Sequence, residues 1–101
     1  MNLYAIRRRQ AWSGPAELEQ AAARSTRVGN EEMPDRVRWI RSYVIQEEDG
    51  TLGSICVYQA TGPDAIEDHA RSAGLRADEI RPVVKTVLVR ADPAEVDSDA
   101  A

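Results

Sequence analysis

Two Gly-Pro pairs divide this chain into two similar halves, and that division limits the folds open to it. Gly14-Pro15 and Gly62-Pro63 each follow an apolar, strand-like stretch. Proline suits the first turn of a helix, because the N–H that it lacks would have no partner there anyway. Each pair therefore predicts the end of a strand and the start of a helix.

The first half predicts one strand and one helix. The strand runs from Leu3 to Ile6 and is extended by the arginines at 7–9. The helix begins at Pro15 and is predicted to stop near Gly29-Asn30, with a polar loop up to residue 36. Its apolar stripe at helical spacing consists of Leu18, Ala21, Ala22, Ser25 and Val28.

The second half predicts a hairpin, a helix and a last strand. The strand 37–47 is rich in β-branched and aromatic residues, and a turn at 48–50 leads to a return strand at 54–60. A helix follows from Pro63 to Gly74. The run Val83–Val89 is the predicted last strand, because four of its seven residues are valine and one is leucine.

The element order is therefore strand, helix, strand, strand, helix, strand. This order predicts an α+β, ferredoxin-like βαββαβ domain over residues 1–90, with two helices on one face of a four-stranded antiparallel sheet. The other face would leave Trp39 and Tyr43 in water. We therefore expect a homodimer that stacks sheet on sheet, a dimeric α/β barrel.

The net charge of −4 comes from the end of the chain. The 17 acidic residues include four within 91–101, where no basic residue occurs, and removing them leaves 13 acidic against 13 basic residues. We predict an acidic, disordered tail at 91–101 and a neutral body. A neutral body argues against nucleic acid as a partner.

The composition also bears on location. The chain has no apolar run of the roughly 18–20 residues that cross a bilayer, and residues 1–10 lack the pattern of a signal peptide. The single cysteine, Cys56, excludes an internal disulfide. We expect a cytoplasmic protein without a membrane partner.

His69 is the only histidine, and it falls on the inward stripe of the second predicted helix. The spacing of Ile66, His69, Ala70 and Ala73 is that of a helix face packed on a sheet. Such an imidazole is either a core side chain satisfied by a carbonyl or hydroxyl, or a proton-transfer or ligand-binding group in a pocket. The spacing leaves both interpretations open.

A second group of candidates lies on the hairpin. Strand alternation predicts that Trp39, Arg41 and Tyr43 share one face, with Tyr58 on the neighbouring strand. A guanidinium between aromatic rings can stack on them and still bind a carboxylate. The alternative is that the aromatic residues form the dimer interface and that Arg41 pairs with an acid across it.

Three segments resemble a known family. The sequences VRWIRSYV at 37–44, CVY at 56–58 and DHARSAGL at 68–75, with Ile80 following, are similar to a small bacterial family of formerly unknown function that includes nickel-binding proteins. The resemblance covers roughly residues 3 to 90. It implies a ferredoxin-like fold, a dimer of the α/β-barrel type, and binding of Ni²⁺ or a similar divalent ion.

One departure from the family pattern concerns the metal. The family commonly has histidine just before Ser-Tyr-Val, where this chain has Arg41, which has no lone pair to donate. A nickel site here would need carboxylates such as Glu47 around His69. The same change builds a site better suited to an anion.

Three functions follow from these observations. The first is a small-molecule-binding protein, as a cofactor-free pathway enzyme with His69 and Tyr43 as catalytic residues and Trp39, Arg41 and Tyr58 binding the substrate. In it His69 moves a proton and Arg41 holds an anionic group. The second is a nickel-binding protein with His69 and Glu47 as ligands. The third is a structural homodimer without a ligand.

Overall fold

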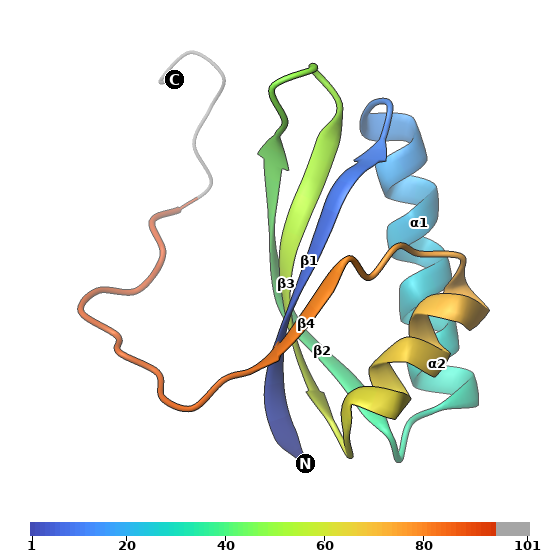
Figure 1. Ribbon diagram of the computed structural model, residues 1–101, viewed down its shortest axis with the longest axis vertical. Coiled ribbons are helices and arrows are strands. Elements are labelled where there is room, and N and C mark those ends of the chain that lie inside the picture. Colours follow the sequence, from blue (N-terminus) through green and yellow to red (C-terminus); the bar gives the residue numbers. More distant parts are fainter. Residues whose placement is uncertain (95–101) are drawn as a thin grey trace.

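Two helices cover one face of a four-stranded antiparallel sheet, and no helix covers the other face (Figure 1). The computed structural model of the protein describes residues 1–94. The strands follow the order β2-β3-β1-β4 across the sheet. The elements are β1 (Asn2–Trp12), α1 (Pro15–Arg27), η1 (Val28–Glu32), β2 (Val37–Gln46), β3 (Leu52–Ala60), α2 (Pro63–Ala73) and β4 (Glu79–Pro82). This confirms the predicted α+β, ferredoxin-like fold.

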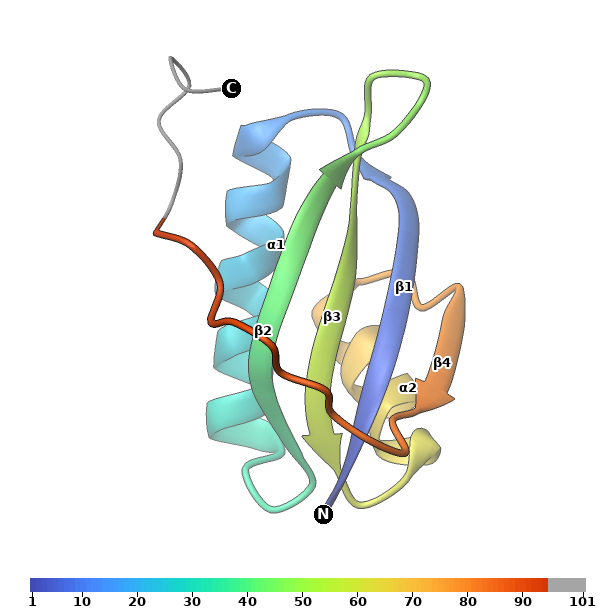
Figure 2. The same cartoon turned by 90° about the vertical axis from the view of Figure 1, so that its left-hand side faces the viewer.

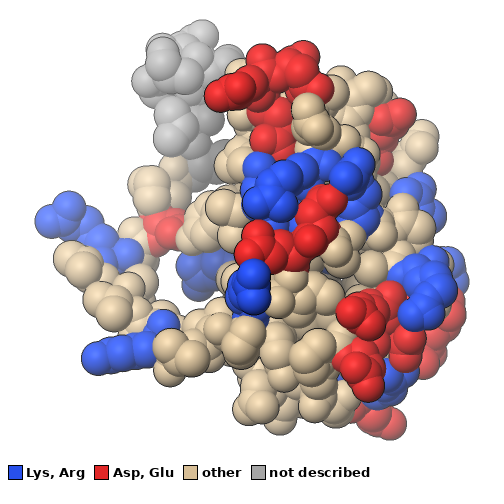
Figure 3. Space-filling view, in the orientation of Figure 1, with Lys and Arg blue, Asp and Glu red and all other residues tan. Residues whose placement is uncertain are grey.

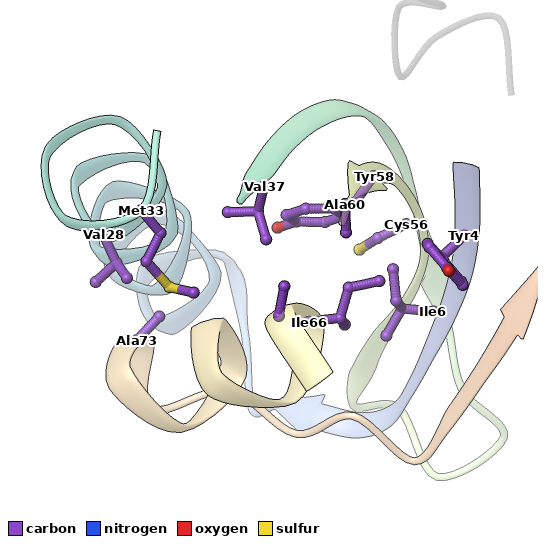
Figure 4. Close-up of a cluster of buried hydrophobic side chains, with 11 residues drawn as sticks. Tyr4, Ile6, Val28, Met33, Val37, Cys56, Tyr58, Ala60, Ile66 and Ala73 are labelled. Atoms are coloured by element: carbon purple, nitrogen blue, oxygen red, sulfur yellow. The ribbon is translucent and has the colours of Figure 1, made fainter. Parts of the chain in front are cut away.

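The core lies between the sheet and the two helices (Figure 4). Alternate residues of β1 and β3 face the helices, so that Tyr4 pairs with Tyr58 and Ile6 with Cys56 in the antiparallel register. The buried stripe of α2 consists of Ala65, Ile66, His69, Ala70 and Ala73. The inward direction predicted for this stripe, His69 included, is confirmed.

The first helix is longer than predicted. It continues past Arg27 into η1, a single π-helical turn in which the amide of Met33 donates to the carbonyl of Val28 at 3.0 Å. This turn puts Val28 and Met33 both into the core, where each is at most 8% exposed. The burial of two apolar side chains therefore overrides the expected stop at Gly29-Asn30.

A bulge in β2 overturns the predicted alternation of that strand. Trp39 pairs with Tyr58, and Arg41 pairs with Val57, which is adjacent to Tyr58 on β3. Two steps along β2 therefore match one step along β3, and Ile40 is an extra residue in the ladder. After the bulge every side chain lies on the opposite face from the one that simple alternation predicts. The prediction that Trp39 shares a face with Arg41 and Tyr43 is therefore wrong.

The last strand is shorter and earlier than predicted. β4 pairs with only four residues of β1, from Tyr4 to Arg7. β4 runs antiparallel to β1, towards the first residues of β1. The amide of Val83 donates to the carbonyl of Leu3 at 2.9 Å, and beyond this hydrogen bond β1 offers β4 no further partner. The predicted strand Val83–Val89 is wrong, and β propensity alone could not form it without a partner strand.

Residues 83–94 form an extended arm, which we call the C-terminal arm. Figures 1 and 2 show it leaving β4 and crossing the face of the sheet that no helix covers. Asp92 accepts hydrogen bonds from the hydroxyl of Tyr43 at 2.8 and 2.9 Å. Of the predicted acidic tail, residues 95–101 lie outside the described part of the chain.

Acidic and basic side chains lie side by side on the surface in Figure 3. Several form ion pairs, among them Arg76–Asp78 at 2.6 Å and Arg36–Asp68 at 2.9 Å. These pairs are exposed to solvent, so they contribute little to stability. Among the described residues, no helix is long and apolar enough to cross a membrane.

Candidate functional site

His69 lies where α1, α2 and the sheet meet. Its side chain is 1% exposed, and Nε2 lies 3.1 Å from the carbonyl oxygen of Ser25. A carbonyl can only accept, so Nε2 carries the proton and Nδ1 keeps a lone pair. Nδ1 is buried and has no hydrogen-bond partner among the described residues. The ring therefore combines a fixed tautomer with a free acceptor atom.

The surroundings of His69 keep it neutral. Burial lowers the pKa of the imidazole, the hydrogen bond to Ser25 raises it, and the positive charge of Arg8 lowers it further. The net direction is downward from 6.5. At neutral pH the ring is therefore uncharged, as a proton acceptor must be.

Tyr58 separates His69 from the rest of the sheet. Its hydroxyl lies 2.8 Å from Oγ of Ser25, and its ring centroid lies 5.3 Å from that of His69. On its other side the ring stacks on Trp39 at 6.0 Å with an interplanar angle of 6°. Burial raises the pKa of the Tyr58 phenol, so it stays protonated.

A cavity of 340 Å³ lies between α1 and the sheet. Its volume falls in the range of about 300–1,000 Å³ that small-molecule sites have. The wall is mainly apolar and includes Trp12, Leu18, Ala21, Ala22, Trp39, Ile40, Val44, Cys56, Tyr58 and Leu75, with Arg8, Arg41 and three serines as its polar members. The cavity can therefore hold an apolar molecule of modest size.

A second hollow, of 610 Å³, lies on the His69 side. It is lined by His69 together with Gly29, and by four residues that also line the first cavity: Ser25, Trp39, Ile40 and Tyr58. Gly29 comes so close that an added Cβ would lie 3.7 Å from Nε2 of His69. The stacked rings of Tyr58 and Trp39 thus form a common wall between the two spaces.

The structure brings three of the predicted site residues together and leaves three elsewhere. Trp39, Tyr58 and His69 meet on the helix side. The guanidinium of Arg41 instead bonds to the Tyr43 hydroxyl at 3.2 Å and pairs with Asp92 at 3.1 Å. The bulge in β2 is what separates these two groups, since it puts Arg41 and Tyr43 on the uncovered face.

Glu47 lies apart from His69. Both of its carboxylate oxygens accept from Arg7, at 2.9 and 3.0 Å, and one also accepts from the amide of Gln10. The hydrogen bond from Arg7 lowers the pKa of this carboxyl. Arg7 pairs in the sheet with Ile55, on the uncovered face, so Glu47 belongs to the far side of the sheet.

The described part of the chain contains no cluster of metal-binding side chains. Among residues 1–94, no three His, Cys, Asp or Glu side chains gather closely enough to hold a metal ion. His69 has a free lone pair at Nδ1, but none of the other residues lining its hollow is His, Cys, Asp or Glu. His69 thus offers a single metal ligand.

Arg8 is a member of the site that sequence reasoning missed. The sequence assigned the arginines at 7–9 only to an extension of the first strand, yet Arg8 is 1% exposed and lines the 340 Å³ cavity. The signal was present in the alternation of the first strand. Strand alternation puts Tyr4, Ile6 and Arg8 on one face, and the first two are apolar core residues.

The comparisons with known proteins agree on one family. The family model "Nickel responsive protein SCO4226-like" matches residues 4–83. The solved structure "Crystal structure analysis of SCO4226 from Streptomyces coelicolor A3(2)" superimposes with a TM-score of 0.66 and 19% identity, covering 84% of this chain and 99% of that one. At this identity it shows the fold. No curated protein matches the chain.

The depressed pKa of His69 predicts that acid destabilises the protein. The unfolded chain takes up a proton near pH 6.5 and the folded chain only at lower pH, so the free energy of unfolding falls as the pH drops below 6.5. The slope should not exceed about 1.4 kcal/mol per pH unit, the limit for the uptake of one whole proton. Urea denaturation between pH 8 and 5.5 measures it, and His69→Gln should remove the slope. A slope that is unchanged in His69→Gln contradicts the assignment.

Proposed function

We propose that this chain, which belongs to the family of nickel responsive SCO4226-like proteins, is a homodimer that binds a small organic molecule between α1 and the sheet. The observation that carries the proposal is the 340 Å³ cavity, which is walled by apolar side chains and shares Tyr58 with the hollow of His69. Its wall includes Trp39, Ile40 and Val44, which are 40–47% exposed, and contiguous exposed apolar surface of this kind marks ligand-binding grooves.

The neighbouring hollow of His69, across the wall of Tyr58 and Trp39, supports acid–base chemistry without a cofactor. His69 is neutral, its tautomer is fixed by Ser25, and Nδ1 is free to accept a proton. Tyr58 and Trp39 offer flat faces against which a ring or chain can stack. Isomerisation, cyclisation and condensation are reactions that need only such orientation and one proton acceptor.

The uncovered face of the sheet and the C-terminal arm support a homodimer. On the sheet, Tyr43 and Ile55 are 43% and 41% exposed. On the arm, Val84, Val87, Leu88 and Val89 are 69–94% exposed, although both ends of the arm are bonded to the sheet. Two apolar surfaces of one chain that do not bury each other are best covered by a second copy.

Arg41 and Tyr43 then belong to the dimer interface. They lie on the uncovered face, where they already bind the carboxylate of Asp92. Any anionic group that they hold in place of Asp92 would lie between the two copies, away from His69. The role first expected of them in a single pocket with His69 is thus replaced by one at the interface.

Nickel binding is the second candidate. It is favoured by the description of the family and by the free Nδ1 of His69. In this proposal His69 is one ligand. The remaining ligands are not among the other residues that line its hollow. The carboxylate of Glu47, expected from the sequence as a partner ligand, would first have to leave Arg7.

Filling the cavity should block binding of an apolar probe. N-phenyl-1-naphthylamine, which fluoresces in apolar surroundings, should bind the wild type. Ala22→Leu should weaken binding at least about tenfold, because overpacking costs about 1–3 kcal/mol. Ala23→Leu adds the same side chain on an exposed position of α1 and should bind like the wild type. Equal binding to both variants, or none to the wild type, contradicts the proposed cavity site.

Calorimetry with Ni²⁺ separates the two candidates. If nickel is the ligand, the wild type should bind it and His69→Ala should lose at least about tenfold in affinity, since removal of a ligand or its support costs about that much. We expect no saturable heat from the wild type, because one ligand does not hold the ion. Tight binding that depends on His69 would overturn this expectation.

A charge on the C-terminal arm should break the dimer. We expect the wild type to sediment as a dimer, and Leu88→Asp to raise its dissociation constant about tenfold or more, because a carboxylate would be buried without a partner. Ser72→Asp adds the same charge on the exposed side of α2 and serves as the control. Sedimentation equilibrium measures both, and a monomeric wild type refutes the homodimer.

A further inference from the structure

Arg8 differs from its two neighbours in having no acidic partner. Arg7 pairs with Glu47, and Arg9 pairs with Glu79. The backbone amide of Arg9 also donates to the carboxylate of Asp78. Arg8 lies opposite Ser54 in the sheet, on the face that the helices cover, and is 1% exposed. Among the described residues it forms no salt bridge, although its charge is permanent.

The guanidinium of Arg8 is held in place but only partly satisfied. Nη1 donates to the carbonyl oxygen of Arg76, and the carbon of the guanidinium lies 5.8 Å from the ring centroid of Tyr58. Nη2 is buried and has no hydrogen-bond partner among the described residues. A buried charge with an unused donor and no counter-ion is unfavourable, which points to a partner that binds from outside the chain.

The cavity that Arg8 lines has no negative charge of its own. No aspartate or glutamate is among its lining residues. Its three serine hydroxyls are already bonded within the chain, Ser25 to Tyr58 at 2.8 Å, Ser42 to Trp39 at 2.7 Å, and Ser54 to Cys56 at 3.2 Å. Ser42 accepts the indole N–H of Trp39 and keeps its own proton, so neutral hydroxyl donors remain, but the guanidinium of Arg8 is the charged donor of the wall that has no acidic partner among the described residues.

We infer that Arg8 recognises an anion, and that the ligand of this cavity is a small carboxylic acid with an apolar body. The inference rests on the proposed binding function and names the class of ligand. A carboxylate accepts two parallel hydrogen bonds from a guanidinium, and it supplies the missing counter-ion. The apolar walls, such as Leu18 and Leu75, accommodate the rest of the molecule.

The wall favours a carboxylate over a phosphate group. A phosphate carries up to two charges and is commonly held by several donors, as at a helix N-terminus or a glycine-rich loop. The cavity lining contains no glycine, and its other arginine, Arg41, is paired with Asp92. One unpaired guanidinium in an apolar wall matches one negative charge on an apolar molecule.

Two pairs of probes test the inference by calorimetry at pH 7.5. Each pair joins an acid to its neutral amide of nearly the same shape: 1-naphthylacetate with 1-naphthylacetamide, and octanoate with octanamide. In the wild type the better-fitting acid should bind about 10- to 100-fold more tightly than its amide, as expected for a hydrogen bond to a charged group. Arg8→Met should lose this preference, and the affinity for the amide should change less than about threefold.

Two further variants complete the design. Arg8→Lys keeps the charge without the fork of donors and should keep part of the preference. Arg81→Met removes an arginine whose side chain is 74% exposed on β4, and it should behave like the wild type. An amide that binds the wild type as tightly as its acid overturns the inference and leaves the proposed function standing. If no probe of either pair binds the wild type, the inference and the proposed function both fail. The wild type alone therefore decides on the inference and on the proposed function.

Discussion

Ser25 is the residue through which both helices are bonded to the sheet. Its hydroxyl lies 2.8 Å from the Tyr58 hydroxyl on β3, and its carbonyl accepts from His69 of α2. The Tyr58 hydroxyl would lack its partner without the serine side chain, at a cost of about 1–3 kcal/mol, whereas His69 bonds to the main-chain carbonyl of the same residue. The position of the imidazole, the angle of the phenol and the shape of both cavities depend on this one polar contact in an apolar layer.

The sequence indicated the general plan because local chemistry and fold agree over most of the chain. The two Gly-Pro pairs start α1 and α2 at Pro15 and Pro63. Gly74 ends α2 in the left-handed conformation, with φ of 68°, which few other residues adopt readily. The stripe 66, 69, 70, 73 placed His69 inside, since helical spacing alone determines which side chains share a face.

What the sequence could not indicate depends on contacts between distant segments. The extra residue Ile40 in β2 is visible only against its partner strand, and it places Trp39 on the helix side of the sheet while Arg41 and Tyr43 lie on the uncovered face. The end of β4 depends on where β1 begins. Arg8 followed the alternation of its strand, but a charged residue at an inward position contradicts the usual pattern, and only the site explains it.

The two unusual polar groups of the core also act on each other through their charges. Arg8 lies over the Tyr58 ring at 5.8 Å, the His69 ring centroid lies 5.3 Å from that of Tyr58, and the positive charge of Arg8 is the smallest of the causes that lower the pKa of His69. A carboxylate bound at Arg8 would offset this charge and raise the pKa of His69 towards its ordinary value. The imidazole would then accept a proton more readily when a ligand is present than when the cavity is empty. Anion binding at Arg8 and proton uptake at His69 would thus be linked, because the same low-dielectric core would contain both charges.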